Sequence, residues 1–122
     1  MRLQESGEMF LESIYVLSKT QGTVRSIEIS EYKGYSKPSV SRAVNLLKNG
    51  GYITMGKDNL ITLTESGLEI AQKIFDRHTL IANLLIRLGV PEKIAAEDAC
   101  KMEPAISAES FEAIRRHMIE HS

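Results

Sequence analysis

At 122 residues, with 43% hydrophobic and 25% charged residues, the chain has the size and composition of one folded domain or two small ones, which excludes a mainly disordered protein. No stretch approaches the roughly 18 apolar residues of a membrane span, and the opening MRLQESGEMF lacks the basic-then-apolar pattern of a secretory signal, so we expect neither a membrane partner nor export. The net charge of −1 alone argues against nucleic-acid binding, while the single cysteine excludes an internal disulfide and predicts a reduced thiol in a cytoplasmic protein.

The start of the chain predicts two helices. Apolar residues at helical spacing predict an amphipathic helix over Glu8–Thr20, which Gly22 ends. Ser26 is expected to cap a short helix over Ile27–Lys33. Gly34 closes this helix, because glycine tolerates the left-handed backbone at which many helices end.

A longer helix and a hairpin are predicted next. Ser36 is expected to cap the helix, and Pro38 falls in its first turn, where a missing N–H costs little. Gly50 and Gly51 stop it. The apolar stripe of this helix consists of Val40, Ala43, Val44 and Leu47. The following segment, YITMGKDNLITLT, has two β-rich runs around the turn residues GKDN, which predicts a hairpin.

Helices are predicted for the rest of the chain. Thr64 is expected to cap a long helix over residues 65–88, which Gly89 ends. Pro91 begins another helix, which the segment EPAIS interrupts. Ser107 caps the last helix.

The order of these elements predicts a mainly α fold with a small β-wing. A helix, a helix-turn-helix and a two-stranded wing make a winged helix-turn-helix, so we expect a DNA-binding domain over residues 1–70. Residues 71–122 are predicted to form a helical dimerisation domain. Because this second half is too short to enclose a core alone, its apolar positions are expected to pack on the first helix and on a second subunit, as in a homodimer.

Basic residues gather in the first half of the chain. Between residues 19 and 57 there are seven basic residues and two acidic ones, a balance of +5, so the remainder carries −6. A basic block inside an acidic chain is typical of a surface that faces phosphates. A solvated charged surface has the same composition, so charge alone leaves both interpretations open.

The segment YSKPSVSRAV predicts a recognition helix, which presents residues near its N-terminus to base edges. Arg42 can pair with guanine or bind phosphate, the ring of Pro38 can lie against a thymine methyl, and Lys57 at the wing tip can meet a flanking phosphate. The candidate DNA-binding residues are Ser26, Ser36, Lys37, Pro38, Ser39, Ser41, Arg42 and Lys57. The other interpretation is that Ser36 only caps its helix and Arg42 is only solvated.

Side chains that can bind a metal occur in pairs at helical spacing. Met9 and Glu12 are three residues apart, as are Cys100 and Glu103, so each pair shares one helix face. His78 lies midway along the long helix between them. This mixture of sulfur, nitrogen and oxygen suits Fe(II), Mn(II), Co(II) or Zn(II) better than Ca(II) or Mg(II), and we expect Fe(II) first and Mn(II) next. Met9, His78 and Cys100 each also fit an ordinary core or interface position. Glu12 and Glu103 do not, because carboxylates on packed helix faces require partners.

Four segments carry a resemblance to a known family. GEMFLESIYVLS, YSKPSVSRAV, LTESGLEIAQKIFDRHTLIANLLIRLGV and EDACKMEP resemble, in order and spacing, the diphtheria toxin repressor and manganese transport regulator family of metal-dependent transcriptional repressors. The resemblance covers nearly the whole chain and implies the short form without an SH3-like domain. It also implies that residues 71–122 bind metal. The implied ligands are Met9, Glu12, His78, Cys100, whose backbone carbonyl also ligates, and Glu103.

Pro104 departs from this family pattern, which has a histidine ligand at that position. Proline has no donor atom for a metal, and it lacks the N–H that would bond the carbonyl of Cys100 in a helix. Either the site survives with the five remaining residues and water, with reduced affinity or altered selectivity, or it is disabled. A second metal site is not expected, because Ala82 and Ala96 stand where iron-type members have a carboxylate and a histidine.

Together these features predict a metal-responsive repressor that binds double-stranded operator DNA as a homodimer, and the resemblance implies that its targets are metal-uptake genes. One alternative is a winged-helix regulator with a disabled metal site that answers an organic ligand or a redox signal through Cys100. Another is a winged helix that only binds other proteins. The sequence has no HExxH motif, no phosphate loop and no placed nucleophile–base pair, so we do not expect an enzyme.

Overall fold

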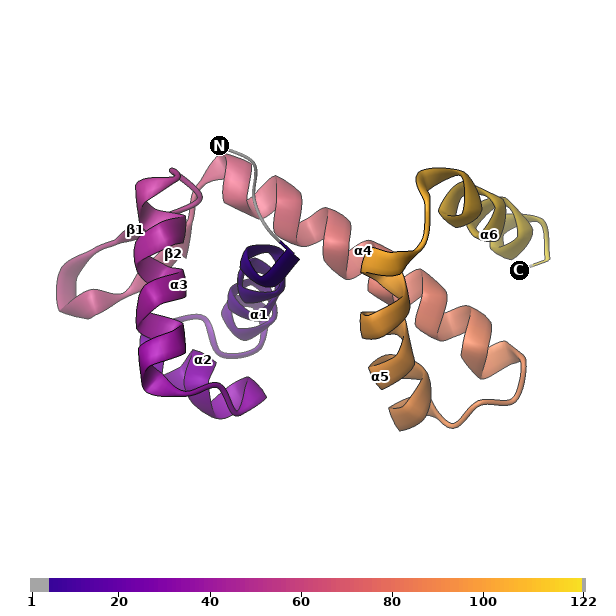
Figure 1. The fold of residues 1–122 in the computed structure, drawn as a ribbon, viewed down its shortest axis with the longest axis horizontal. Coiled ribbons are helices and arrows are strands. Elements are labelled where there is room, and N and C mark those ends of the chain that lie inside the picture. The colour runs from indigo at the N-terminus through magenta and orange to yellow at the C-terminus, as the bar shows by residue number, and fades with distance from the viewer. Residues whose placement is uncertain (1–4, 122) are drawn as a thin grey trace. The chain divides into compact units, whose positions relative to one another are not determined.

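The computed structural model describes residues 5–121 and is mainly helical (Figure 1). The chain divides into two compact units, residues 1–72 and 73–122. Predictions that concern residues 1–4 and 122 lie outside the described residues. Within the described part of the chain, no helix combines the length and the hydropathy that crossing a membrane requires.

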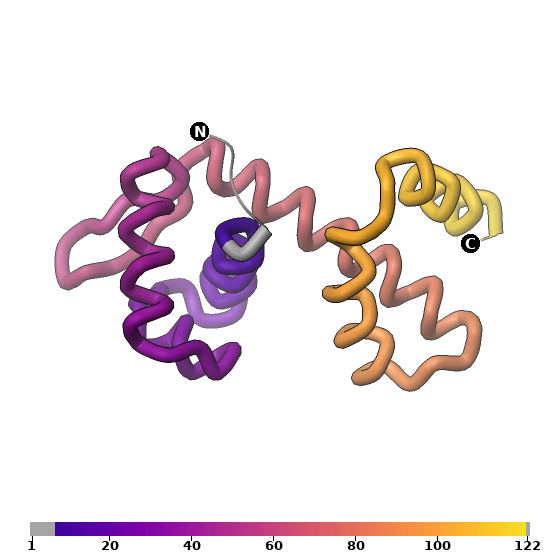
Figure 2. Tube along the Cα trace, viewed as in Figure 1, coloured from indigo at the N-terminus to yellow at the C-terminus, as the bar shows by residue number. Residues whose placement is uncertain are grey.

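The first unit is the winged helix-turn-helix that the element order predicts. Its elements are α1 (Glu5–Gln21), α2 (Ser26–Lys33), α3 (Lys37–Asn49), β1 (Ile53–Met55), the short 3-10 turn η1 (Lys57–Asn59), β2 (Ile61–Leu63) and the start of α4 (Glu65–Arg87). The strands are antiparallel, with Ile53 opposite Leu63 and Met55 opposite Ile61. Figure 2 follows the chain from α3 through this hairpin into α4. The predicted hairpin is therefore confirmed.

Apolar faces of α1, α2, α3 and the hairpin build the core of the first unit. In this unit α1 contacts α2, α3 and β2, while α3 contacts α2 and β1. Six of the core side chains are at most 1% exposed: Leu11, Ile14, Ile29, Val40, Leu47 and Ile53. Burial of one such side chain stabilises the fold by about 1.5–3 kcal/mol, so this core holds the recognition helix against α1.

The helix ends follow from local hydrogen bonds. The Oγ of Ser36 accepts from the N–H of Ser39 at 3.3 Å, which confirms the predicted cap of α3. The prediction that Ser26 caps α2 is wrong. The helix begins at Ser26 and its N-cap is Arg25, whose backbone N–H donates to Oε1 of Glu28 at 2.8 Å. The carboxylate, placed in the positive first turn, takes over the role expected of the serine hydroxyl.

The wing is tied to the segment that precedes α2. Its turn closes with the N–H of Gly56 donating to the carbonyl of Leu60 at 2.9 Å, and Asp58 and Asn59 both have φ of 60°. The Nε of Arg25 donates to the carbonyl of Asp58 at 3.2 Å. At its base, the N–H of Ile61 donates to the carbonyl of Val24 at 2.8 Å. Hydrogen bonds thus join both the tip and the base of the wing to the segment that precedes α2.

The first turn of α4 packs against the chain that enters the wing. The Oγ1 of Thr64 accepts from the N–H of Gly67 at 3.2 Å, so the predicted cap at Thr64 is confirmed. The N–H of Thr64 donates to the carbonyl of Tyr52 at 3.0 Å. Gly67 is buried here, and a β-carbon at this position would overlap the carbonyl oxygen of Tyr52. Only glycine fits this close approach of two backbone segments.

The second unit continues α4 and adds α5 (Glu92–Met102), the 3-10 turn η2 (Glu103–Ala105) and α6 (Ala108–Glu120). Gly89, with φ of 102°, makes the turn after α4, and η2 is the interruption expected at EPAIS. The Oγ of Ser107 accepts from the N–H of Ser110 at 3.1 Å, as predicted for a cap. Four large apolar side chains of this unit are at least 40% exposed: Ile86, Leu88, Ile94 and Ile119.

Candidate metal centre and nucleic-acid interface

The outer face of α3 carries most of the candidate DNA-binding residues. Val40, Val44 and Leu47 turn into the core, so the other side of the helix faces outward. Exposed on α3 or at its cap are Ser36, Lys37, Pro38, Ser41 and Arg42. Ser39 is half-buried, and its Oγ accepts a long hydrogen bond of 3.5 Å from Nη2 of Arg42. That contact occupies one of the five N–H donors of the guanidinium, which leaves donors for a base or a phosphate.

Ser26 belongs to the same surface although it lies on α2. Ser26, Lys37 and Ser41 line an open hollow of about 330 Å³ between α2 and α3. Hydroxyl and ammonium groups of this kind are common partners of the phosphate backbone. The structure therefore brings Ser26, a candidate on α2, next to two candidates on α3.

Lys57 lies where the hairpin prediction places it, at the tip of the wing. It is exposed and begins the turn η1, directly before Asp58. The acidic neighbour reduces the positive potential at the tip, so any phosphate contact depends on the reach of the lysine side chain rather than on the local charge.

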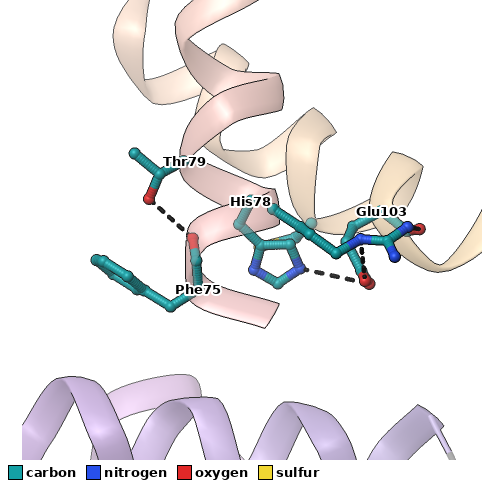
Figure 3. Close-up of polar contacts among 6 residues, drawn as sticks. Phe75, His78, Thr79 and Glu103 are labelled. Carbon is teal, nitrogen blue, oxygen red and sulfur yellow. Dashed lines mark hydrogen bonds and ion pairs between the residues drawn. The ribbon is translucent and has the colours of Figure 1, made fainter. Parts of the chain in front are cut away.

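Three candidate metal ligands come together in the second unit. His78 of α4 is 8% exposed. The Sγ of Cys100 on α5 lies 3.9 Å from its Nδ1. Oε2 of Glu103 in η2 lies 3.8 Å from its Nε2 (Figure 3). A thiol and a carboxylate that follow His78 by 22 and 25 residues in sequence thus meet at its imidazole ring. Sequence spacing alone predicted the pairing of Cys100 with Glu103 but gave no contact with His78.

The other two candidates, Met9 and Glu12, lie on α1 in the first unit, one helical turn apart. Glu12 is 8% exposed and Met9 is half-buried. The backbone carbonyl of Met9 accepts a hydrogen bond of 3.1 Å from the Oγ of Ser13. A buried carboxylate is stable only beside cations or hydrogen-bond donors, which is the environment that a metal ligand also needs.

Arg77 is a residue of this region that the sequence prediction missed. Its Nε lies 3.2 Å from Oε1 of Glu103, and its Nη2 donates to the backbone carbonyl of Glu103 at 3.5 Å. Its Cζ stands 4.6 Å from the ring centroid of Phe111. The available signal was a basic residue directly before His78. Adjacent helix residues point in different directions, however, so this signal does not place Arg77 at Glu103.

The donors fit a first-row transition metal. Thiolate and imidazole suit such ions, and the carboxylate adds a hard oxygen. Cys100 and Glu103 face opposite nitrogens of the ring, and an imidazole nitrogen binds a metal along its own lone pair. In this ring orientation one ion meets His78 together with Cys100 at Nδ1, or together with Glu103 at Nε2. Pro104, in η2, is exposed and adds no donor.

Known protein families account for nearly all of the chain. Residues 2–59 match the family model described as the N-terminal DNA-binding domain of iron-dependent repressors. Residues 64–121 match the model described as the metal-binding and dimerisation domain of the same repressors. The chain belongs to the iron-dependent repressor family. The fold and the family that the sequence predicted are thereby confirmed.

Two relatives are similar to this chain over most of its length. An uncharacterised helix-turn-helix transcriptional regulator of Methanocaldococcus jannaschii is 35% identical over 118 residues, which are 95% of this chain and 94% of that protein. The transcriptional regulator MntR of Escherichia coli is 32% identical over 112 residues, 92% of this chain and 72% of the relative.

Solved structures share the same fold. The crystal structure of IdeR from T. acidophilum matches with a TM-score of 0.81 at 21% sequence identity. The match covers 97% of this chain and 55% of that one, so the chain spans about half the length of that protein. As members of the iron-dependent repressor family are metal-dependent transcriptional regulators, this chain is a metal-responsive, DNA-binding regulator.

Proposed function

We propose that this iron-dependent repressor family member is a cytoplasmic homodimer, without enzymatic activity, that represses transcription by binding operator DNA when it holds Fe(II), with Mn(II) as the next candidate. The observation that carries the proposal is the meeting of His78, Cys100 and Glu103 in the second unit. The preference for Fe(II) rests on the thiol, because a soft thiolate suits Fe(II) better than it suits Mn(II).

Five side chains would hold the ion once the ring of His78 is turned so that one of its nitrogens faces the other donors. They are Met9, Glu12, His78, Cys100 and Glu103. A bound divalent cation supplies a positive charge that all of these donors can share. The donors bind it most tightly in the arrangement that lets ligands from α1 and from the second unit reach it together. Binding therefore shifts the population toward that arrangement. Because α1 packs on α2 and α3, a constraint on α1 is also a constraint on the recognition helix.

The DNA would be bound by two copies of the outer face of α3. In a symmetric dimer two such helices enter successive major grooves of a pseudo-palindromic site. The exposed residues of α3 and the hollow shared with α2 support this assignment. Pairing of two second units is supported by four exposed apolar residues: Ile86, Leu88, Ile94 and Ile119. A dimer interface would remove their apolar surface from water, which is favourable.

An anaerobic selection from random-sequence DNA duplexes tests this function. The protein is incubated with the duplex pool in the presence of Fe(II), Mn(II) or a chelator, and the retained DNA is sequenced. We expect a two-fold symmetric sequence to be enriched with metal and lost with chelator. Retention should also fall steeply as salt rises, because phosphate contacts release counterions. Enrichment that is equal with chelator contradicts metal control.

Replacing Arg42 with alanine is expected to weaken binding to the selected duplex by about 10- to 100-fold, because a bidentate contact to guanine contributes about 1–3 kcal/mol. Lys48→Ala is the matched control, since Lys48 lies in the last turn of the same helix and is also exposed. Fluorescence anisotropy with the labelled duplex measures both. Equal losses for the two variants would mean that Arg42 contributes only general charge.

Replacing Pro104 with histidine is expected to tighten Mn(II) binding at least about tenfold, because it supplies a further imidazole beside Glu103. Pro104→Ala is the control, as it restores the backbone N–H and adds no donor. Anaerobic isothermal titration of each variant measures the affinity. If the titration curves of Pro104→His and Pro104→Ala coincide, this position has no part in metal binding.

A second candidate function is redox control through Cys100, favoured by the 3.9 Å between its Sγ and Nδ1 of His78. A neighbouring imidazolium stabilises a thiolate and makes it more reactive toward oxidants. This function predicts DNA binding that ignores chelators and changes with peroxide. The metal-dependent function predicts the reverse in the same assay.

A further inference from the structure

The guanidinium of Arg77 is held at three points within the second unit. It pairs with the carboxylate of Glu103, donates to the backbone carbonyl of the same residue, and lies over the ring of Phe111. The paired side chains are only 19% and 13% exposed, so water screens their attraction weakly.

Glu103 divides its two carboxylate oxygens between two partners. Oε1 faces Arg77 at 3.2 Å. Oε2 faces Nε2 of His78 at 3.8 Å (Figure 3). The carboxylate that the proposed metal centre needs is therefore already paired with a positive charge. A divalent cation that uses Glu103 would have to share this one carboxylate with the guanidinium.

We propose that Arg77 sets the metal affinity of this centre as a built-in competitor for Glu103, an inference that rests on the proposed function. In the metal-free protein Arg77 is the ion-pair partner of the nearly buried Glu103. A divalent cation that uses Glu103 must bind against the charge of Arg77, so its affinity is lower than the donors alone would give. The centre then fills only at a higher metal concentration.

A purely structural ion pair leads to a different expectation. If Arg77 only oriented Glu103, its loss would leave the carboxylate free to move and metal binding would weaken. If it only stabilised the fold, metal affinity would not change. When Arg77 is lost, competition therefore predicts tighter metal binding, whereas the two other roles predict weaker or unchanged binding.

Titration of Arg77→Gln with Mn(II) and with Co(II), under anaerobic conditions, tests the competition. We expect binding about tenfold tighter than in the unmodified chain, because the metal ion no longer has to weaken an ion pair between two nearly buried charges. Arg115→Gln is the matched control: Arg115 pairs with Glu112 at 2.8 Å on α6, where both side chains are about half exposed, so the same charge is lost from the same unit. Arg77→Lys keeps the charge and should stay within about threefold of the unmodified affinity.

Equal or weaker metal binding by Arg77→Gln overturns the inference, as does equal tightening in Arg115→Gln. If Arg77→Gln does not fold, Arg77→Met is titrated with the same expectation, and thermal unfolding of metal-free Arg77→Met, Glu103→Gln and the double variant must show coupling between the two residues. Absence of coupling also overturns the inference. If the unmodified chain binds no metal, the inference requires that Arg77→Gln or Arg77→Met does bind metal.

Two other results would contradict the proposed function itself. One is equal metal binding by the unmodified chain and a His78→Ala variant, and the other is DNA retention that metal does not alter. Metal-dependent retention together with unchanged affinity in Arg77→Gln leaves the proposed function standing and removes only the competitor.

Discussion

Replacing His78 with alanine is expected to lower the affinity for Mn(II) or Co(II) at least about 100-fold and to abolish metal-dependent DNA binding. His78 contacts both Cys100 and Glu103, so its loss separates their donors. Groups that only support a metal ligand already contribute about 10- to 100-fold, and a direct ligand contributes more. Anaerobic titration gives the affinity, and anisotropy with the selected duplex gives the DNA binding.

His117→Ala is the control for this experiment. His117 is exposed on α6 and its ring stacks on His121 at 4.2 Å, so its removal takes away an imidazole without touching the His78 cluster. We expect its metal affinity to match that of the unmodified chain. If His78→Ala retains full metal affinity while His117→Ala loses it, the metal centre has been placed in the wrong part of the second unit.

Replacing Gly67 with alanine is expected to lower the free energy of unfolding by about 3 kcal/mol. The added methyl group would overlap the carbonyl oxygen of Tyr52, a backbone atom that cannot rotate away. Relief requires α4 to move from the segment that enters the wing, which breaks the hydrogen bond from Thr64 to Tyr52. Overpacking of this kind costs about 1–3 kcal/mol even where side chains can adjust. Urea denaturation followed by circular dichroism at 222 nm measures the change.

Gly56→Ala provides the comparison at a second glycine of the same unit. Gly56 has φ of −98° and open space around its α-carbon, so alanine fits there without strain. We expect its free energy of unfolding to stay within about 1 kcal/mol of the unmodified value, since only the entropy of the unfolded chain changes. Equal destabilisation by both substitutions would mean that contact with Tyr52 is not the cause.

The fold was predictable from the sequence wherever local chemistry decides it. Ser36 and Ser107 cap helices because their hydroxyls reach an N–H three residues on, and Pro38 fits the first turn because it lacks a donor. The error at Ser26 arose in the same chemistry. The helix begins one residue earlier than predicted, and the carboxylate of Glu28 reaches back to the N–H of Arg25, a contact that a search for a capping hydroxyl does not detect.

The candidate site was predictable only in part. Helical spacing placed Cys100 and Glu103 on one face, but their contacts with His78 arise from the packing of α4, α5 and η2, which spacing does not encode. Arg77 was missed for the same reason. Its partner Glu103 is 26 residues away, and its second support, Phe111, lies on another helix. The roles of all these residues in metal binding stay predictions.

The bonds that join the wing to the helix-turn-helix have a consequence for the choice of DNA. Arg25 donates to the carbonyl of Asp58, and the carbonyl of Val24 accepts from Ile61 at the base of β2, so the wing is tied to the segment that precedes α2. If α3 and Lys57 bind DNA as proposed, these bonds restrict the distance between the two contacts. A duplex would then have to adopt a groove width that suits this distance. We therefore expect base pairs outside the contacts to influence affinity through their stiffness.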